Sequence, residues 1–174
     1  DPETLKYFFE DVDTPSGCPS LVQMVIEGIV LPNESNFSKD LKEQAKLEMN
    51  KGPSNWDQAA IDRARYVITD LIDDLRDPIN HKETLGAGSR LYECLADFYF
   101  RSNGNWSAKG KTIDRKLKTL DIEIANDFYT AFLKLFKENN PVSVISLAEK
   151  ILTPFGGFLF DGYKLDAPEG WRKS

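Results

Sequence analysis

A basic cluster beside one of the expected helix starts offers phosphate-binding chemistry. It consists of Lys109, Lys111 and Arg115. The first amides of a helix lack partners within the helix and, together with the helix dipole, attract anions. The surrounding sequence approaches a phosphate-binding loop, but five residues separate Gly104 from Gly110 where that loop has four. We therefore expect a phosphate contact at these three cations without a true phosphate-binding loop; the alternative is that they are simply solvated.

Four aspartates share one face of a long expected helix. They are Asp70, Asp73, Asp74 and Asp77. Their spacing places them within one or two helical turns of each other, where like charges repel unless they are paired or bound to a cation. Asp73 and Asp74 are the candidates for a wall that faces a cationic amine or Mg²⁺, since carboxylate oxygens suit both. The alternative is a solvated acidic face that arginines of the same helix partly neutralise.

Arg76 and His81 form a further candidate pair. The four residues between them resemble the arginine–histidine spacing of the helical HEPN nucleases and nucleotide-binding domains. That resemblance implies that the pair activates a ribose hydroxyl and stabilises phosphate charge. Pro78 is expected to end the helix between them, and a histidine near a helix end is more often a surface residue.

Helices are expected to position most of these side chains. Ser38 and Gly52 are expected to bound the first of them, and a capping box over Ser54–Asp57 precedes a long apolar stripe that ends at Pro78. The expected helices carry residues 41–49, 61–75, 85–98, 112–120 and 124–136, and a last helix begins at the Asn140-Pro141 cap and ends before Pro154. Asp121 and Asn140 are the expected caps of the last two.

The two ends of the chain follow other patterns. Leu21–Ile26 is expected to be helical and Gly28–Leu31 to be a short strand, which needs a partner because an isolated strand leaves its backbone groups unpaired. The segment therefore either packs irregularly or belongs to a sheet that this chain lacks. Phe155–Tyr163 is aromatic and glycine-rich, so it cannot be helical throughout, and we expect its aromatic rings to lie against the helices.

The predicted fold is all-α. It comprises an irregular leading segment over residues 1–35 and a domain over residues 36–174, in which five or six helices form a bundle that ends in a glycine- and aromatic-rich tail. The chain of 174 residues, with 41% hydrophobic and 29% charged residues, has the size and composition of one globular domain.

The charge and the reactive residues exclude several classes of protein. The formal charge of −6 argues against general binding to nucleic acid or to anionic membranes. Two cysteines and one histidine are too few for a disulfide framework or a histidine-rich metal site. No apolar run approaches the roughly 20 residues that span a bilayer. We expect a cytoplasmic protein, and the first residue, Asp1, suggests a fragment of a longer chain.

Several stretches together resemble a known family. They are Ile26–Leu31 (IEGIVL), residues 65–75 (RYVITDLIDDL), residues 106–120 with Gly110 and Lys111, and Pro154–Tyr163 (PFGGFLFDGY). These stretches are similar to the C-terminal helical domain of bacterial nucleotidyltransferase-fold proteins of the aminoglycoside-adenylyltransferase type. The first would correspond to the closing strand of the catalytic core, and the others to the helical domain behind it.

The resemblance implies that the catalytic half lies outside this chain. In that family a Gly-Ser pair and a following Asp-x-Asp hold Mg²⁺ for nucleotide transfer to a hydroxyl. Here Asp11-Val12-Asp13 has no Gly-Ser before it, and Gly88-Ser89 is followed by Asp97-Phe98-Tyr99, which lacks the second carboxylate. Mg²⁺ and a nucleoside triphosphate are thus implied for the parent protein. No catalytic residue, metal ligand or cofactor is expected in this chain, which alone should be inactive.

Three functions remain open from the sequence. The leading one is a helical accessory domain, in which Lys109, Lys111 and Arg115 meet nucleotide phosphates while Asp73 and Asp74 face a small-molecule acceptor; its partner is the missing catalytic domain. The second is a stand-alone helical interaction module, antitoxin-like or nucleotide-sensing, that uses the apolar segment Leu21–Leu31. The third is a HEPN-type ribonuclease that uses Arg76 and His81.

Overall fold

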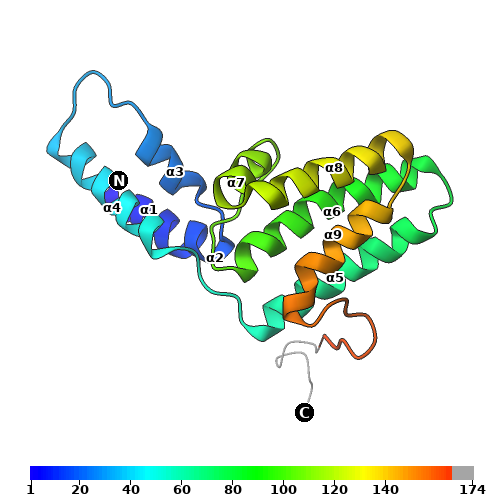
Figure 1. Ribbon diagram of the computed structural model, residues 1–174. Helices are drawn as coiled ribbons and strands as arrows, with labels where there is room; N and C mark the ends of the chain where they lie inside the picture. Colours follow the sequence, from blue (N-terminus) through cyan, green and yellow to red (C-terminus); the bar gives the residue numbers. More distant parts are fainter. Residues whose placement is uncertain (166–174) are drawn as a thin grey trace, which may run out of the picture. The chain divides into compact units, whose positions relative to one another are not determined.

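The computed structural model describes residues 1–165, whose regular elements are all helices and which contain no strand (Figure 1). This confirms the all-α prediction. The elements are α1 (Pro2–Tyr7), the π-helical turn η1 (Phe8–Asp13), α2 (Thr14–Ser16), α3 (Ser20–Glu27), α4 (Asn36–Lys51), α5 (Gln58–Arg76), α6 (His81–Ser102), α7 (Thr112–Leu120), α8 (Ile122–Glu138), α9 (Val142–Leu152) and the 3₁₀ turn η2 (Thr153–Phe155).

The described chain groups into two compact units. Unit 1 comprises Asp1–Asp57 and Leu95–Asn126, and unit 2 comprises Gln58–Cys94 and the chain from Asp127 onward. Helices α6 and α8 therefore contribute residues to both.

The beginning of unit 1 is more helical than its sequence pattern suggests. Its helices run continuously through η1, and Phe9, Val22 and Ala45 form a small buried core between this segment and α4. Asp13 is 4% exposed, and one oxygen of its carboxylate accepts the backbone N–H groups of Leu21 and Val22 at 2.7 and 2.9 Å. A buried carboxylate thus caps α3, because Pro19 at its N-cap position offers no side-chain acceptor.

The strand predicted over Gly28–Leu31 is wrong. The backbone at Gly28 is extended, but the segment is an irregular connection between α3 and α4. Extended backbone becomes a strand only when a neighbouring strand pairs with it, and the described residues offer none.

Helix boundaries agree with the expected caps in most places. Helix α4 ends at Gly52 as predicted, but begins two residues before Ser38, because Ser35 and Ser38 form the reciprocal capping box. Helix α7 spans the predicted residues, and Asp121 caps α8 by accepting two backbone N–H groups at 3.0 Å. Asn140 accepts the backbone N–H of Val142 at 3.0 Å, at the start of α9.

The capping box predicted at Ser54 is wrong, because the backbone groups of Ser54 form hydrogen bonds with residues distant in the sequence. Ser54 donates its N–H to the carbonyl of Thr14 at 3.1 Å, and its own carbonyl accepts Arg101 Nη2 at 2.7 Å. Helix α5 begins only at Gln58.

Arg101 is the buried charge around which unit 1 is arranged. Its side chain is 3% exposed, and its guanidinium lies 5.5 Å from the centroid of the Trp56 ring. Burial lowers the pKa of Arg101, while the nearby Asp97 carboxylate opposes that shift. Gly17 packs so closely on the guanidinium that a β-carbon there would lie 1.1 Å from Arg101 Nη1.

Unit 2 is a bundle built from α5, the first part of α6, the second part of α8, and α9. In Figure 1, α5 and α9 lie side by side. The apolar stripe predicted for α5 forms its buried face, with Ile68, Ile72 and Leu75 fully buried. Gly88 lets α6 approach α8 closely, since a β-carbon there would lie 2.7 Å from Leu135.

We expect Gly17→Ala to destabilise the protein more than Gly104→Ala. Both glycines have a positive φ, 74° and 70°, so alanine is strained at either position by about 1 kcal/mol. A methyl group at Gly104 meets no atom within 4 Å, whereas at Gly17 it displaces Arg101 from Ser54 and Trp56. Denaturant unfolding should give an additional loss of about 1–3 kcal/mol for Gly17→Ala. Equal losses in the two variants would show that Arg101 contributes little.

Candidate functional site

An acidic cavity opens on unit 2 where the end of α5 meets the beginning of α6. Its volume is about 510 Å³, within the range of small-molecule sites. Residues of α5, of the α5–α6 connection and of α6 line it: Leu71, Asp73, Asp74, Asp77, Ile79, Glu83, Gly86, Ala87 and Arg90. The structure thus brings the predicted residues Asp73 and Asp74 into one hollow, whereas Asp70 on the same helix does not line it.

The charges of the cavity are only partly compensated. Asp73 Oδ1 accepts Arg76 Nη1 at 2.5 Å, and Glu83 Oε2 accepts the backbone N–H of Ile79 at 2.8 Å. Within residues 1–165, Asp74 and Asp77 form no ion pair. The cavity therefore presents carboxylates that a cationic ligand could neutralise.

The lining of the cavity includes four carboxylates, those of Asp73, Asp74, Asp77 and Glu83. Among residues 1–165, no group of three or more histidine, cysteine, aspartate or glutamate side chains is arranged to hold a metal ion.

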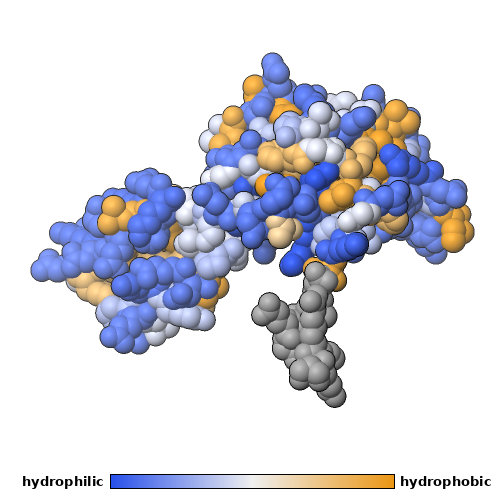
Figure 2. All heavy atoms as spheres, turned by 90° about the horizontal axis from the view of Figure 1, so that it is seen from below, coloured by the Kyte–Doolittle hydropathy of each residue, from blue (hydrophilic) through white to orange (hydrophobic). Residues whose placement is uncertain are grey.

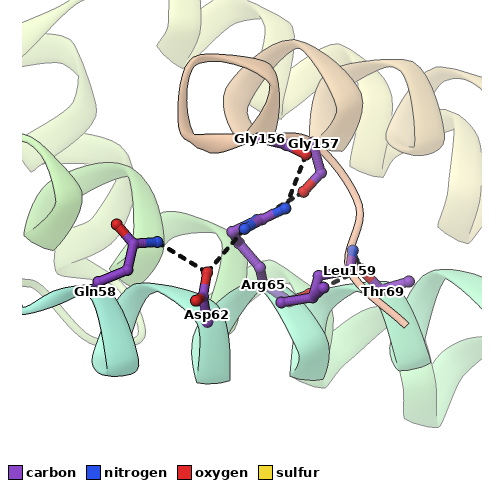
Figure 3. A network of polar contacts seen from close by, with 7 residues as sticks. All are labelled: Gln58, Asp62, Arg65, Thr69, Gly156, Gly157 and Leu159. Carbon is purple, nitrogen blue, oxygen red and sulfur yellow. Dashed lines mark hydrogen bonds and ion pairs between the residues drawn. The ribbon is translucent and has the colours of Figure 1, made fainter. Parts of the chain in front are cut away.

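A polar network fixes the C-terminal tail on the helix that carries Asp73 and Asp74 (Figure 3). Arg65 is 8% exposed, and its Nε and Nη2 donate to the carbonyls of Gly157 and Gly156, each at 2.8 Å. Its Nη1 donates to Asp62 Oδ1, also at 2.8 Å. Leu159 adds a backbone N–H bond to Thr69 Oγ1 at 2.9 Å. All three nitrogens of this buried guanidinium therefore donate a hydrogen bond.

Aromatic rings extend the contact between the tail and α5. The Tyr66 ring stacks on Tyr163 with centroids 4.5 Å apart and on Phe160 at 5.7 Å. The Arg76 guanidinium, which pairs with Asp73, also lies 5.5 Å from the centroid of the Phe158 ring. The prediction that aromatic rings of the tail lie against the helices is confirmed, and Arg76 connects the tail with the rim of the cavity.

The predicted basic cluster lies in unit 1. Lys109, Lys111 and Arg115 are exposed around the beginning of α7. The hydroxyl of Thr112 donates to the carbonyl of Lys109 at 2.8 Å, and the Thr112 N–H bonds the same carbonyl at 3.1 Å. The backbone N–H of Thr112, the first residue of α7, is thus hydrogen-bonded within the turn. The side chains of Lys109, Lys111 and Arg115 are exposed to solvent. Next to them, burial lowers the pKa of Lys116.

Arg76 and His81 have different partners in the structure. Arg76 contacts Asp73 and Phe158, whereas His81 Nδ1 lies 2.9 Å from Asn139 Oδ1. Both side chains lie in unit 2, at the end of α5 and the beginning of α6.

Two residues of the cavity were not singled out from the sequence: Glu83 and Arg90, which line it from α6. Arg65 was expected to neutralise aspartates of its own helix, and it pairs with Asp62 but also holds the tail. The spacing of Glu83 and Arg90 by seven residues, two helical turns, is a signal that they share one face of α6. No sequence signal indicated that this face meets the acidic face of α5.

Figure 2 shows a largely hydrophilic face with apolar residues in small, separate groups. In the part of the chain that the structure describes, no helix is long and apolar enough to cross a bilayer. Neither protein-family models nor curated proteins nor solved structures yield a match to this chain.

We expect Arg65→Lys to loosen the tail, with Arg63→Lys as the matched control on the same helix. Lysine cannot bond two carbonyls and a carboxylate in the geometry of the planar guanidinium, whereas Arg63 is exposed. The free energy of unfolding should fall by about 1–3 kcal/mol for Arg65→Lys, and amide exchange should accelerate at Leu159. Unchanged exchange at Leu159 would contradict the anchoring role of Arg65.

Proposed function

We propose that this chain is a helical substrate-binding domain whose acidic cavity takes an amine-bearing small molecule. In this proposal it serves as the accessory domain of a nucleotidyltransferase-type protein, and the amine-bearing molecule is the acceptor. The observation that carries the proposal is the cavity of about 510 Å³ that Asp73, Asp74, Asp77 and Glu83 line.

The charge balance of the cavity favours a ligand with two or more ammonium groups. Arg76 and Arg90 offset two of the four carboxylates, which leaves an excess of two negative charges. Ammonium groups spaced along one molecule can each meet a carboxylate. A hydroxyl-rich polyamine of the aminoglycoside kind has this chemistry and a compatible size.

The location of Asp13 supports the assignment of catalysis to another domain. Of the two carboxylates in Asp11-Val12-Asp13, that of Asp13 is buried and caps α3 through Leu21 and Val22. A carboxylate that is committed to two backbone amides is a poor metal ligand, and this motif therefore does not supply the metal cradle that nucleotide transfer needs.

The basic cluster is the proposed contact for nucleotide phosphates. Lys109, Lys111 and Arg115 are exposed and close in sequence, so their charges add at one place on unit 1. Support for this role comes from the resemblance of residues 106–120 to the middle of the nucleotidyltransferase helical domain.

We expect the double variant Asp73→Asn/Asp74→Asn to bind an aminoglycoside about tenfold more weakly than the wild type, as a loss of about 1.4 kcal/mol implies. Asparagine keeps the size of each side chain and removes its charge. Asp70→Asn is the matched control, since Asp70 is exposed on the same helix but does not line the cavity. Isothermal titration at two salt concentrations measures the effect. An equal loss of affinity in the Asp70→Asn variant would show that the ligand is attracted by acidic surface charge in general and not by the carboxylates of the cavity.

We expect alanine at Lys109, Lys111 and Arg115 to weaken binding of Mg²⁺-ATP and to reduce its dependence on salt, because three cations that face the phosphates are removed. The matched control replaces exposed lysines of unit 2, Lys82, Lys134 and Lys137. Thermophoresis with labelled nucleotide measures both variants. If the control variant weakens binding as much, the cluster at α7 is not a phosphate site.

A further inference from the structure

Arg76 lies between the acidic cavity and the C-terminal tail and contacts both. Its Nη1 donates to Asp73 Oδ1 at 2.5 Å, and its guanidinium lies 5.5 Å from the centroid of the Phe158 ring. Within residues 1–165, the guanidinium has no second carboxylate or carbonyl partner. Its position is therefore set by one carboxylate of the cavity lining and one ring of the tail.

Contacts that do not involve Arg76 hold Phe158 in place. The two glycine carbonyls before it accept the guanidinium of Arg65, and the N–H of the residue after it donates to Thr69 Oγ1, so both sides are anchored on α5 (Figure 3). The face of an aromatic ring attracts a guanidinium. The docked tail therefore favours the position in which Arg76 reaches the cavity lining.

Arg76 competes with a cationic ligand for Asp73. This carboxylate carries a single negative charge, and the guanidinium already occupies one of its oxygens. An ammonium group that approaches the same carboxylate is attracted to it but is repelled by the guanidinium beside it. Whatever holds Arg76 on Asp73 thus weakens the binding of an amine in the cavity.

We propose that the docked tail lowers the affinity of the acidic cavity for amine-bearing ligands, because Phe158 holds Arg76 on Asp73. This regulation presupposes the amine-binding function proposed above. Coupling between two sites is reciprocal, so a ligand that displaces Arg76 loosens the tail by the same factor by which undocking of the tail tightens the ligand. The side chains of Arg76 and Asp73 are 49% and 44% exposed, so solvent screens them and the factor is about two- to fivefold.

Calorimetric titration with kanamycin, an aminoglycoside, tests whether Arg76 competes with the ligand. Arg76→Gln removes the competing cation and should tighten binding about fivefold. Arg63→Gln is the matched control, since it removes the same charge from an exposed position of the same helix that does not line the cavity. Equal tightening in both variants overturns the proposal, because it reflects the net charge alone.

A second set of variants tests whether the ring of the tail acts through Arg76. Phe158→Leu keeps an apolar side chain and the net charge but removes the ring, and it should tighten binding about twofold. Phe160→Leu is the control and should leave the affinity unchanged, since this ring stacks on Tyr66. In the Arg76→Gln background, Phe158→Leu should have no further effect, because effects that share one route are not additive. Additive effects, or equal tightening in the two leucine variants, overturn the proposal.

Amide exchange at Leu159 measures the reciprocal effect of the ligand on the tail. The N–H of Leu159 donates to Thr69 Oγ1 at 2.9 Å and so reports docking of the tail. Saturating kanamycin should accelerate this exchange about twofold, and unchanged or slower exchange overturns the proposal. If kanamycin binds neither the wild type nor Arg76→Gln, the proposed function is wrong and the regulation falls with it. Binding to the wild type without tightening in Arg76→Gln overturns the regulation alone.

Discussion

A guanidinium removed from water loses its hydrogen bonds to water, and each unit of this chain buries one such group against segments distant in the sequence. Arg65 has protein acceptors for three nitrogens, whereas Arg101 Nε has none among the described residues. In unit 1, Arg101 meets the carbonyl of Ser54 and the ring of Trp56, and Gly17 closes over it. In unit 2, Arg65 meets two consecutive carbonyls of the tail and one carboxylate. Because a buried charge without partners is costly, these contacts favour the observed packing of distant segments beside each arginine.

The cavity depends on the second of these arrangements. Helix α5 contributes its apolar stripe to the core, its Arg65 and Tyr66 to the tail, and its Asp73 and Asp74 to the cavity. Three faces of α5 therefore contact other parts of the structure: the core, the tail and the cavity. These contacts hold the helix, and with it the carboxylates of Asp73 and Asp74, in position. The connection through Arg76, which touches both Asp73 and Phe158, makes the tail part of the support of the cavity.

The sequence predicts local features of this structure well and long-range ones poorly. Helix ends that depend on nearby caps, such as Gly52 and Asp121, lie where they were expected. The capping box at Ser54 and the strand after Gly28 were wrong because contacts with distant residues, or their absence, decide both. In the candidate site, helical spacing alone predicts that Asp73 and Asp74 share a face of α5. That Glu83 and Arg90 lie beside them depends on how α6 packs against α5, which the sequence does not reveal.

We propose that an amine-bearing ligand enters the cavity instead of binding diffusely to the acidic surface. An NMR titration of the ¹⁵N-labelled chain with an aminoglycoside tests this most directly. We expect chemical-shift changes that saturate and that are largest at the backbone amides of Gly86 and Ala87. These two residues line the cavity and carry no charge of their own. Shifts that are spread over exposed carboxylates such as Asp70, without saturation, would contradict the account.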